Sequence, residues 1–305
     1  MKIGVNGSSI SGSLTGVGRC LLNILRCWDK APRDHAFVVY LRGTEQLPRE
    51  FEFLRDSAAI SVRALERHAR FYGLWLSRRI PRAVQQDRVG YFLTPDYFLS
   101  KRTARRCPAA LTLHDVSFLA HPEWFSTRMR IAHWVFSKRS TPTATAVFTV
   151  SRFSADEILR LTRARTDRVH VVPNATDASF GALGQRESVA PRPKPYFLYV
   201  GEIFNRRHVP EMLRGFDMFL QRNADVDVQF LIRGANRSKP FIDVERIASE
   251  INERHGRECV ELLPRLTDEQ LQELYRGALA LFYLSTYEGF GLPVLEAMHL
   301  GTVAV

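Results

Sequence analysis

Short apolar runs alternate with stretches of helical periodicity along the first half of the chain. The runs lie near residues 2–6, 37–41, 90–94, 109–113, 146–150 and 169–172. Each run has the length of a strand, and helical patterns separate several of them. Because intervening helices return the chain to the same end of a sheet, this order predicts an α/β domain with a mainly parallel sheet.

A second series of the same kind occupies the rest of the chain. Its strands are expected near residues 196–200, 228–232, 259–263 and 279–284, and its helices near residues 208–221, 240–254, 268–277 and 293–300. Between the two series lies a stretch with little periodicity and three close prolines, Pro191, Pro193 and Pro195. We therefore expect a Rossmann-like domain over residues 1–176, a linker over 177–195 and a second Rossmann-like domain over 196–305.

Two glutamates, Glu288 and Glu296, stand between the last predicted strand and the last predicted helix. They belong to the string Tyr-Glu-Gly-Phe-Gly-Leu-Pro-Val-Leu-Glu-Ala-Met, which begins at Tyr287. The two glycines allow the loop backbone to approach a ligand closely, and Pro293 suits the first position of a helix. Glu288 is therefore expected in the loop and Glu296 one turn into the helix.

Carboxylates at such a place suit hydroxyl groups. An ionised carboxylate only accepts hydrogen bonds and can take both hydroxyls of a ribose, while the helix start suits a phosphate. One glutamate on a sugar ring and one on a ribose would form a clamp for a nucleotide sugar. For the glutamate spacing alone, a capped helix with a solvated carboxylate is an open alternative.

The whole string resembles the E-x7-E signature of the retaining nucleotide-sugar glycosyltransferases of glycosyltransferase family 4. The resemblance implies the GT-B architecture, in which two Rossmann-like domains with mainly parallel sheets face a cleft. It also implies a catalytic role for Glu288 beside the donor sugar and a ribose contact for Glu296. The residues between them that it assigns to donor binding are Gly289, Phe290, Gly291 and Leu292.

The beginning of the chain resembles the first strand, loop and helix of the same family. The strand at residues 2–6 leads into a glycine-rich stretch over residues 12–19, and a helical pattern follows over residues 20–28. In the family, backbone amides of this loop face the donor diphosphate, which implies donor binding at Gly16 and Gly18. Taken alone, the glycine cluster also suits an ordinary turn.

His114 and Asp115 directly follow the apolar run at residues 109–113. They resemble the His-Asp pair of the family, which implies a catalytic histidine that faces the donor sugar and phosphate, and donor binding by Asp115. The carboxyl end of a strand is also where open α/β sheets place ligand groups. The alternatives are a structural histidine and an aspartate that orients the imidazole or caps the next loop.

Residues 199–208, Tyr-Val-Gly-Glu-Ile-Phe-Asn-Arg-Arg-His, resemble the family motif that opens the second domain. The resemblance implies that Arg206 and Arg207 neutralise the donor diphosphate. Arg207 stands where lysine is usual and spreads the same charge over a planar fork, and His208 stands where asparagine is usual. Two solvated arginines before a helix are the alternative.

The implied activity is retaining transfer of a hexose from a nucleoside-diphosphate sugar to a lipid-linked or cell-envelope glycan. His114 and Asp115, together with the Pro-Glu-Trp-Phe stretch at residues 122–125, look most like bacterial mannosyltransferases of surface polysaccharide synthesis, so GDP-mannose is the first donor we expect. No cofactor or metal is expected, because arginines and helix N-termini supply positive charge for the phosphates. Asp225 and Asp227 have the spacing of a metal-binding pair, but they precede a strand, which favours a polar strand entry.

Composition agrees with two domains outside the membrane. The chain has 305 residues, of which 45% are hydrophobic. No apolar run approaches the ~20 residues of a membrane span, and the first strand begins without a secretory signal. The cysteines at positions 20, 27, 107 and 259 have no metal-ligand spacing. We therefore expect reduced thiols in a protein that is cytoplasmic or peripheral at the inner face of the cell membrane.

Residues 301–305 have the pattern of another buried strand, yet nothing follows to cover it. In the resembled family, further strand and helix units follow, and a final helix returns to the first domain. We therefore expect a truncated chain with an incomplete second domain.

The formal net charge of +11 is the strongest competing signal. Residues 61–110 contain eleven Arg or Lys and three Asp or Glu, without a nucleic-acid recognition motif, so no specific nucleic acid is expected. In residues 63–82, arginines alternate with aromatic and aliphatic residues, a composition typical of an interfacial helix on an anionic membrane. Core aromatics with solvated arginines are the alternative.

This charge also supports a second function. The chain would then be a noncatalytic, truncated relic that binds anionic membrane or nucleic acid through its basic face. Hydrolysis or transfer of the donor sugar distinguishes the enzyme from the relic.

Overall fold

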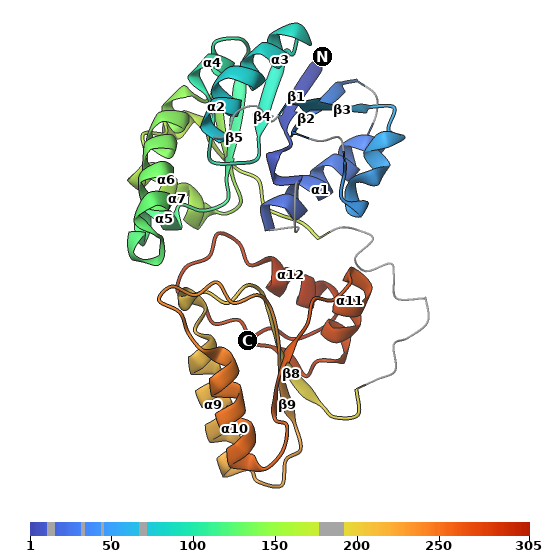
Figure 1. The fold of residues 1–305 in the computed structure, drawn as a ribbon, viewed down its shortest axis with the longest axis vertical. Helices are drawn as coiled ribbons and strands as arrows, with labels where there is room; N and C mark the ends of the chain where they lie inside the picture. The colour runs from blue at the N-terminus through green and yellow to red at the C-terminus, as the bar shows by residue number, and fades with distance from the viewer. Residues whose placement is uncertain (11–15, 32–33, 44–45, 67–71, 177–191) are drawn as a thin grey trace. The chain divides into compact units, whose positions relative to one another are not determined.

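The computed structural model describes residues 1–305 except 11–15, 32–33, 44–45, 67–71 and 177–191. The chain forms two compact units, Met1–Asn174 and Ala175–Val305, each built on its own sheet (Figure 1). Most of the predicted linker, residues 177–191, lies outside the described part. None of the described helices is long and apolar enough to cross a membrane.

The first unit contains a seven-stranded sheet in which every neighbouring pair is parallel. In sheet order its strands are β3 (Ile60–Leu65), β2 (Ala36–Arg42), β1 (Lys2–Asn6), β4 (Tyr91–Thr94), β5 (Ala109–Leu113), β6 (Ala146–Thr149) and β7 (Val169–Val171). The six strands predicted for this unit are confirmed. The prediction missed β3, because Ser61 and Arg63 interrupt its apolar pattern at the edge of the sheet.

The order of this sheet reverses beside β1, since β2 and β3 lie on one side and β4 to β7 on the other. Such a reversal leaves a crevice at the carboxyl ends of the two central strands, where open α/β sheets bind ligands. We therefore expect functional groups at the carboxyl ends of β1 and β4 and of the neighbouring β5.

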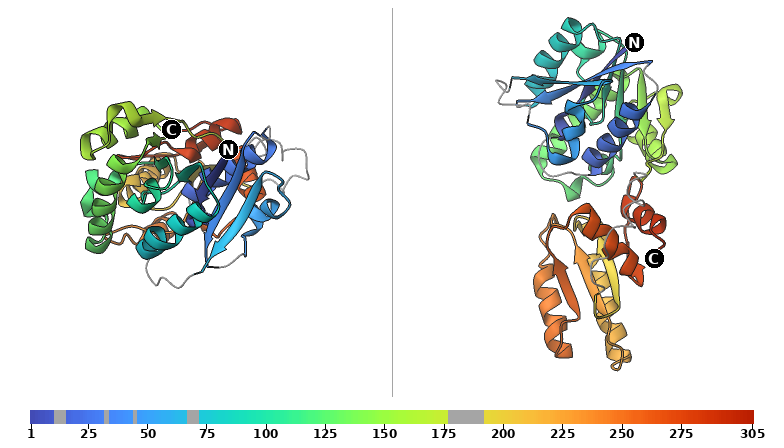
Figure 2. Two further views of the ribbon diagram at one scale, coloured as in Figure 1. Left: turned by 90° about the horizontal axis from the view of Figure 1, so that it is seen from above. Right: turned by 90° about the vertical axis from the view of Figure 1, so that its right-hand side faces the viewer.

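Helices cover both faces of the first sheet (Figure 1, Figure 2). They are α1 (Gly16–Lys30), α2 (Tyr72–Leu74), α3 (Ile80–Gln86), α4 (Lys101–Ala104), α5 (Ser117–Ala120), α6 (Thr127–Ser140) and α7 (Arg152–Leu161). In β2, Val38 and Tyr40 join one core and Val39 joins the other, as alternation along a strand requires. Both faces of the sheet are thus buried, which accounts for the continuous apolar runs of its strands.

The basic stretch at residues 63–82 is not an interfacial helix. Its described part includes α2, a short π-helix η3 (Trp75–Arg79) and the beginning of α3. Trp75 and Ile80 are completely buried and Leu76 nearly so, and all three belong to the core of the first unit. These apolar side chains are therefore unavailable to a lipid surface, and the part of the prediction that relied on them is wrong.

The second unit contains a four-stranded parallel sheet. Its strands in sheet order are β10 (Val260–Leu263), β9 (Gln229–Arg233), β8 (Tyr196–Val200) and β11 (Ala280–Leu281). Its helices are α9 (Val209–Arg222), α10 (Val244–His255), α11 (Asp268–Gly277) and α12 (Leu292–His299). α9 and α10 bury one face and α11 and α12 the other, as Figure 2 (right) shows. All four predicted strands and all four predicted helices are present.

The last predicted strand is shorter than the apolar run at residues 279–284. Leu279 and Leu284 are 52% and 46% exposed, because only the middle of the run lies inside the sheet. Residues 301–305 align parallel to β11, with hydrogen bonds from Leu281 N to Val303 O and from Val305 N to Leu281 O, both 2.8 Å. The expected strand is thus present only as an isolated bridge between Leu281 and Ala304, and its expected burial is wrong, because Val303 and Val305 are 64% and 67% exposed.

The orientation of the basic stretch can be tested by comparing two neighbouring residues. We expect Trp75→Ala to lower the free energy of unfolding by about 3 to 5 kcal/mol, because it leaves a large cavity in the core. Leu74→Ala is the matched control, since Leu74 is 39% exposed and its truncation should cost less than about 1 kcal/mol. Chemical denaturation of both variants would show equal losses if the aromatic face pointed to solvent.

Candidate functional site

Two glycines contact each other where β8 and β9 end. Gly201 follows β8, and Gly234 follows β9. Gly201 has a φ of 140°, and its N–H donates to Arg233 O at 2.9 Å. A β-carbon added to Gly234 would overlap Gly201 O, and one added to Gly201 would overlap the Arg207 guanidinium. Only glycine therefore allows Arg207 to lie against the end of this strand.

Arg207 and Glu288 form an ion pair between the loop after β8 and the loop after β11. Arg207 Nε donates to Glu288 Oε1 at 2.7 Å. The Ser285 hydroxyl donates to the same oxygen at 3.2 Å, and Arg206 Nε lies 3.8 Å from it. The structure thus brings together three residues that the sequence predicted for the donor site.

The Arg206 backbone also connects the two loops. Its carbonyl accepts a hydrogen bond from Thr286 N at 3.0 Å and shares the single proton of the Ser285 hydroxyl, 3.3 Å away, with Glu288 Oε1. The Arg206 guanidinium stacks over the Phe204 ring, 4.5 Å from its centroid. Both loops are consequently fixed relative to each other by backbone contacts as well as by charge.

The ionic side chains of this cluster are largely removed from water. Side-chain exposure is 11% for Arg206, 12% for Arg207 and 20% for Glu288. Burial by itself would lower the pKa of Arg207, but the hydrogen bond and the charge of Glu288 outweigh it, so that its pKa is raised. The Arg207 guanidinium is therefore charged, and neither arginine is solvated as the alternative interpretation required.

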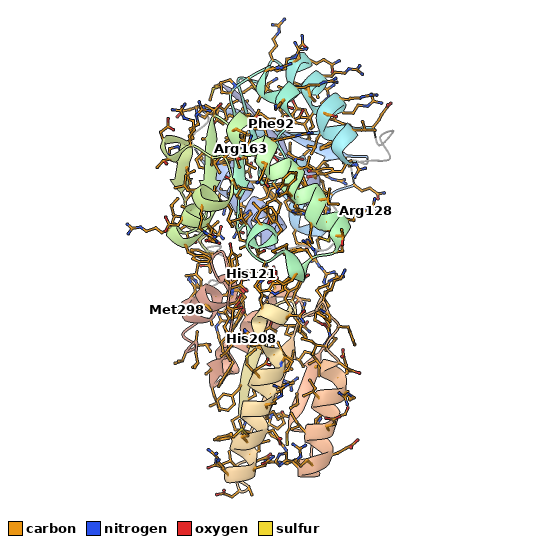
Figure 3. All side chains as sticks on the ribbon, turned by 90° about the vertical axis from the view of Figure 1, so that its left-hand side faces the viewer. Phe92, His121, Arg128, Arg163, His208 and Met298 are labelled. Atoms are coloured by element: carbon orange, nitrogen blue, oxygen red, sulfur yellow. The ribbon has the colours of Figure 1, made fainter. Side chains whose placement is uncertain are left out.

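His208 occupies the left-handed region, with φ 48° and ψ 36°, immediately before α9 (Figure 3). Asparagine and histidine are among the non-glycine residues most often found there. This backbone conformation explains why histidine can stand where the resembled motif has asparagine. It also turns the chain into α9 directly after the two arginines.

Glu296 lies elsewhere in the second unit, in α12. It is buried, and its Oε2 accepts a hydrogen bond from the Tyr275 hydroxyl of α11 at 3.0 Å. The solvated carboxylate is thus excluded, and the placement of Glu288 in a loop and Glu296 in a helix is confirmed. Tyr275 was not singled out by the sequence, because a tyrosine in an amphipathic helix looks like any core residue.

The residues between the two glutamates form the turn into α12. Gly291 is the residue before the helix and has a φ of 93°, which favours glycine. Gly289 is buried, while Phe290 and Leu292 are half-buried. Gly291 therefore occupies a backbone conformation that glycine favours, and the close approach of this loop to a ligand remains a prediction.

In the first unit, His114 lies at the carboxyl end of β5. Burial lowers its pKa, against the opposing effects of the Asp115 charge and of a hydrogen bond to the Pro95 backbone. Its Nε2 is buried and has no partner among the described residues. Because proline offers only a carbonyl, Nδ1–H is the donor to Pro95, and Nε2 of the neutral ring is left as an acceptor.

Asp115 serves the local turn. Its Oδ1 accepts hydrogen bonds from the Ser117 backbone N–H at 2.9 Å and from the Ser117 hydroxyl at 2.8 Å. It therefore holds the chain at the entry to α5, as the capping alternative proposed. Its assignment to donor binding is not tested by this contact.

A partly buried polar network, which the sequence did not indicate, lies at the ends of β1 and β4. Asn6 Nδ2 donates to the Tyr72 hydroxyl and to Thr94 Oγ1, both at 3.1 Å. The Tyr72 hydroxyl donates to Asp96 Oδ2 at 2.7 Å, and burial raises the pKa of that carboxyl. These residues come from distant segments, so that only the sheet order could have indicated their proximity.

Gly16 and Gly18 lie in the first turn of α1 and not in a loop. The helix begins earlier than the predicted residue 20, because Gly18, Leu21, Leu22 and Leu25 form one buried stripe at helical spacing. Residues 11–15 of the glycine-rich stretch lie outside the described part. The donor role of both glycines remains a prediction.

Metal-binding groups are not apparent in the described ranges, where no three His, Cys, Asp or Glu side chains gather closely enough to hold an ion. Asp227 accepts hydrogen bonds from Lys194 at 3.0 Å and from Arg257. These contacts agree with the interpretation of Asp227 as a polar residue at the beginning of a strand.

Two family models match successive parts of the chain. The model described as Glycosyltransferase Family 4 matches residues 14–180, and the one described as Glycosyl transferases group 1 matches residues 184–305.

Among proteins of similar sequence, the O-antigen chain mannosyltransferase B of Escherichia coli is 27% identical over 322 residues, which cover 100% of this chain and 82% of that protein. The serotype-specific mannosyltransferase WbdA of the same organism is 26% identical, over 99% of this chain and 39% of that protein. The crystal structure of Anabaena HepE in complex with UDP and glucose has a TM-score of 0.65 at 19% identity, over 100% of this chain and 80% of HepE. This structural likeness establishes the same two-domain GT-B fold.

The lowered pKa of His114 predicts a pH dependence of stability. Above its ordinary pKa of 6.5 the ring is neutral in both states, so that the contribution is constant. Below that pH the unfolded ring takes up a proton that the folded ring refuses, and stability falls until the pH reaches the lower folded pKa. Since burial also lowers the pKa of His133, the test compares wild type with His114→Gln.

We expect the free energy of unfolding of His114→Gln to fall less steeply below pH ~6.5, by up to about 1.4 kcal/mol per pH unit. Denaturant titrations at several pH values give this slope. Identical slopes in both proteins would show that His114 is not held neutral.

Proposed function

The chain belongs to Glycosyltransferase Family 4, and we propose a reaction for it on that basis. The protein would transfer a hexose from a nucleoside-diphosphate sugar to a hydroxyl of a lipid-linked or cell-envelope glycan. The observation that carries the proposal is the cluster of Arg206, Arg207 and Glu288. It combines two charged guanidinium groups with one carboxylate at the carboxyl ends of parallel strands, where phosphate and sugar hydroxyls require opposite partners.

The arginines would hold the donor diphosphate. Their low exposure strengthens the attraction for a phosphate, because little water screens it. Arg207 Nε donates to Glu288 Oε1, and we propose that a phosphate oxygen accepts this hydrogen bond when the donor binds. We propose that no metal is needed for this step, since the two guanidinium groups supply the positive charge as the leaving diphosphate accumulates negative charge.

The names of similar proteins guide the choice of donor. Two relatives are named as mannosyltransferases, one of them for an O-antigen chain, while HepE was solved with UDP and glucose. We therefore propose mannose as the transferred sugar and GDP-mannose as its donor. The protein would act at the inner face of the cell membrane, where a lipid-linked acceptor is available.

Retention would proceed by departure and attack on the same face of the anomeric carbon. Glu288 would hold the donor sugar beside that carbon, where developing positive charge makes a carboxylate most valuable. The neutral His114 offers its Nε2 as a hydrogen-bond acceptor for a sugar hydroxyl. Glu296, oriented by Tyr275, would accept hydrogen bonds from the ribose.

The direct test is nucleotide release from a panel of nucleotide sugars, with and without a mannose-terminated acceptor. We expect GDP to be released from GDP-mannose, and faster with the acceptor than without it. Turnover of another donor would overturn the choice of sugar alone. Failure to bind or turn over any nucleotide sugar would instead favour the noncatalytic relic.

The phosphate role predicts a loss of nucleotide affinity. Arg206→Ala and Arg207→Ala should each weaken binding of a nucleoside diphosphate by about 1.5 to 3 kcal/mol, the range for hydrogen bonds to charged groups. Arg214→Ala is a matched control, because this exposed arginine of α9 pairs only with Glu211 in the described part. Calorimetry that gives equal affinities for all three variants would contradict the assignment.

The two glutamates should differ in their effects. Glu296→Ala should weaken free nucleotide and whole donor alike, and thus raise KM more than it lowers kcat. Glu288→Ala should depress kcat strongly, while its affinity for free nucleotide stays the same or rises, because Arg207 loses its competing carboxylate.

Steady-state kinetics and nucleotide titrations of both variants provide the measurement. Tyr275→Phe tests the hydrogen bond to Glu296 separately from the carboxylate itself. It removes the hydroxyl that orients the carboxylate and keeps the aromatic ring in the core. The roles would be wrong if Glu288→Ala lost nucleotide affinity and kept its turnover.

A further inference from the structure

Tyr283 carries a buried hydroxyl group that has no hydrogen-bond partner among the described residues. The residue lies just after β11, at the beginning of the loop that leads to Glu288. Its backbone is fixed, because Tyr283 N donates to Val305 O at 2.8 Å. The side chain packs against the core on the α11 and α12 face of the second sheet. The hydroxyl is therefore held in the interior without a partner of its own.

The ring of Tyr283 borders the cluster of Arg206, Arg207 and Glu288. Arg207 Cζ lies over this ring, 5.3 Å from its centroid. A β-carbon added to Gly291, the residue before α12, would lie 3.9 Å from Tyr283 Cε1. Tyr283 thus contacts both the arginine that we assign to phosphate and the turn into the last helix.

An unpaired hydroxyl in this position is unfavourable for folding. A hydroxyl that leaves water without gaining a hydrogen bond destabilises the folded chain, and phenylalanine would fill the same space without that cost. Buried polar groups are for this reason almost always paired. An exception beside a candidate site is explained if a ligand supplies the missing partner.

The missing partner is a hydrogen-bond acceptor. Burial raises the pKa of the Tyr283 hydroxyl, against the opposing charge of Arg207, so that it keeps its proton at neutral pH and can donate. The guanidinium group beside it also offers only donors. One oxygen atom that reaches both groups would therefore accept hydrogen bonds from both.

Glu288 does not supply this oxygen in the structure. Its Oε1 accepts from Arg207 Nε at 2.7 Å and lies 3.2 Å from the Ser285 hydroxyl, yet it makes no hydrogen bond to Tyr283. A phosphate group carries several strongly accepting oxygens and pairs with arginine and hydroxyl donors alike. A phosphate that replaces Glu288 at Arg207 would bring an acceptor to Tyr283 at the same time.

We propose that the Tyr283 hydroxyl donates a hydrogen bond to the β-phosphate of the nucleotide-sugar donor, beside Arg207. The assignment rests on the proposed function and adds a binding residue to its phosphate site. The β-phosphate is the one bonded to the sugar, and the carboxylate that we assign to the sugar, Glu288, is the ion-pair partner of Arg207. Arg207 and Tyr283 are therefore assigned to this phosphate.

The test compares Tyr283→Phe with Tyr196→Phe, which each remove one hydroxyl from the second unit. Tyr196 in β8 is the matched control, because its hydroxyl already donates to Leu274 O at 2.9 Å. Affinities for GDP, GMP and inorganic pyrophosphate are measured by calorimetry. Thermal unfolding of both variants is recorded without ligand.

Tyr283→Phe should weaken binding of GDP and pyrophosphate at least about tenfold, the effect of one hydrogen bond to a charged group. Its affinity for GMP should stay the same, since GMP lacks the β-phosphate. Its unfolding temperature should stay the same or rise, because the hydroxyl makes no bond in the free protein. Tyr196→Phe should show the reverse, with a lower unfolding temperature and unchanged affinities.

Unchanged GDP affinity of Tyr283→Phe would overturn the proposal, and so would equal losses for GDP and GMP. A lower unfolding temperature with full GDP affinity would show that the hydroxyl binds a buried water and serves the fold alone. Arg207→Ala distinguishes the two levels of failure. If it loses GDP affinity while Tyr283→Phe does not, only the role of Tyr283 is wrong, whereas wild type that binds no nucleoside diphosphate contradicts the proposed function as well.

Discussion

Burial of both faces of two parallel sheets is the constraint on which the rest of this structure depends. Strands covered on both faces are largely apolar along their length, so that polar side chains gather at strand ends and on edge strands such as β3. The network of Asn6, Thr94 and Asp96 and the ring of His114 lie at such ends in the first unit. Arg207 and Glu288 follow strand ends in the second. Functional chemistry is therefore confined to a few loops.

The ion pair of Arg207 and Glu288 is partly buried, which limits its contribution to stability. A partly buried ion pair contributes little net stability, because desolvation of both charges offsets their attraction. Here the pair joins two loops that the hydrogen bonds from Thr286 N and from the Ser285 hydroxyl to Arg206 O also connect, so that the ion pair is not their sole link. A ligand that replaces Glu288 as the partner of Arg207 explains this buried pair better than a gain in stability does. This is the physical basis for our proposal that the cluster binds a donor diphosphate and its sugar.

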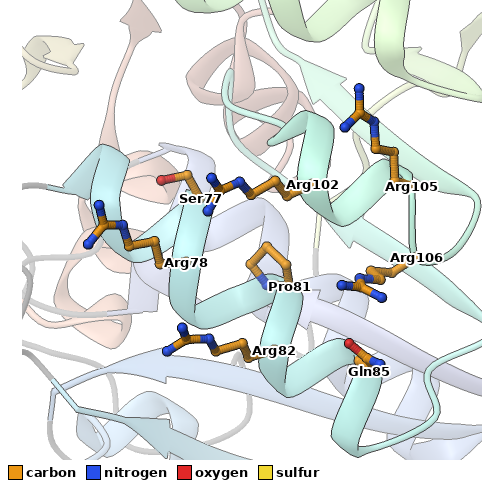
Figure 4. A pocket seen from close by; sticks show the side chains of 8 residues that line it. All are labelled: Ser77, Arg78, Pro81, Arg82, Gln85, Arg102, Arg105 and Arg106. Carbon is orange, nitrogen blue, oxygen red and sulfur yellow. The ribbon is translucent and has the colours of Figure 1, made fainter.

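The arginines of the chain occur in two different environments. At the strand ends, arginines have a carboxylate beside them, and most of their surface is covered. Between α3 and α4 of the first unit, by contrast, five exposed arginines line one pocket without an ion pair among the described residues, namely Arg78, Arg82, Arg102, Arg105 and Arg106 (Figure 4). The first arrangement suits a small ligand that enters a site with little water, whereas the second is a solvated surface cluster. One chain thus carries two kinds of arginine site.

The sequence by itself determined the class of fold, most of the strands and helices, and the location of Glu288 in a loop and Glu296 in a helix. These features depend on local periodicity and on glycine and proline, whose effects act over a few residues. It could not reveal β3, whose polar residues hide its pattern, nor the inward orientation of Trp75, because an amphipathic stretch has the same composition in a core and on a membrane. Tertiary structure alone decided that Tyr275 orients Glu296, that Asn6 meets Tyr72 and Asp96, and that two distant groups of arginines line one hollow. Those contacts join residues far apart in the chain, and their proximity follows from sheet order and helix packing, which no local pattern encodes.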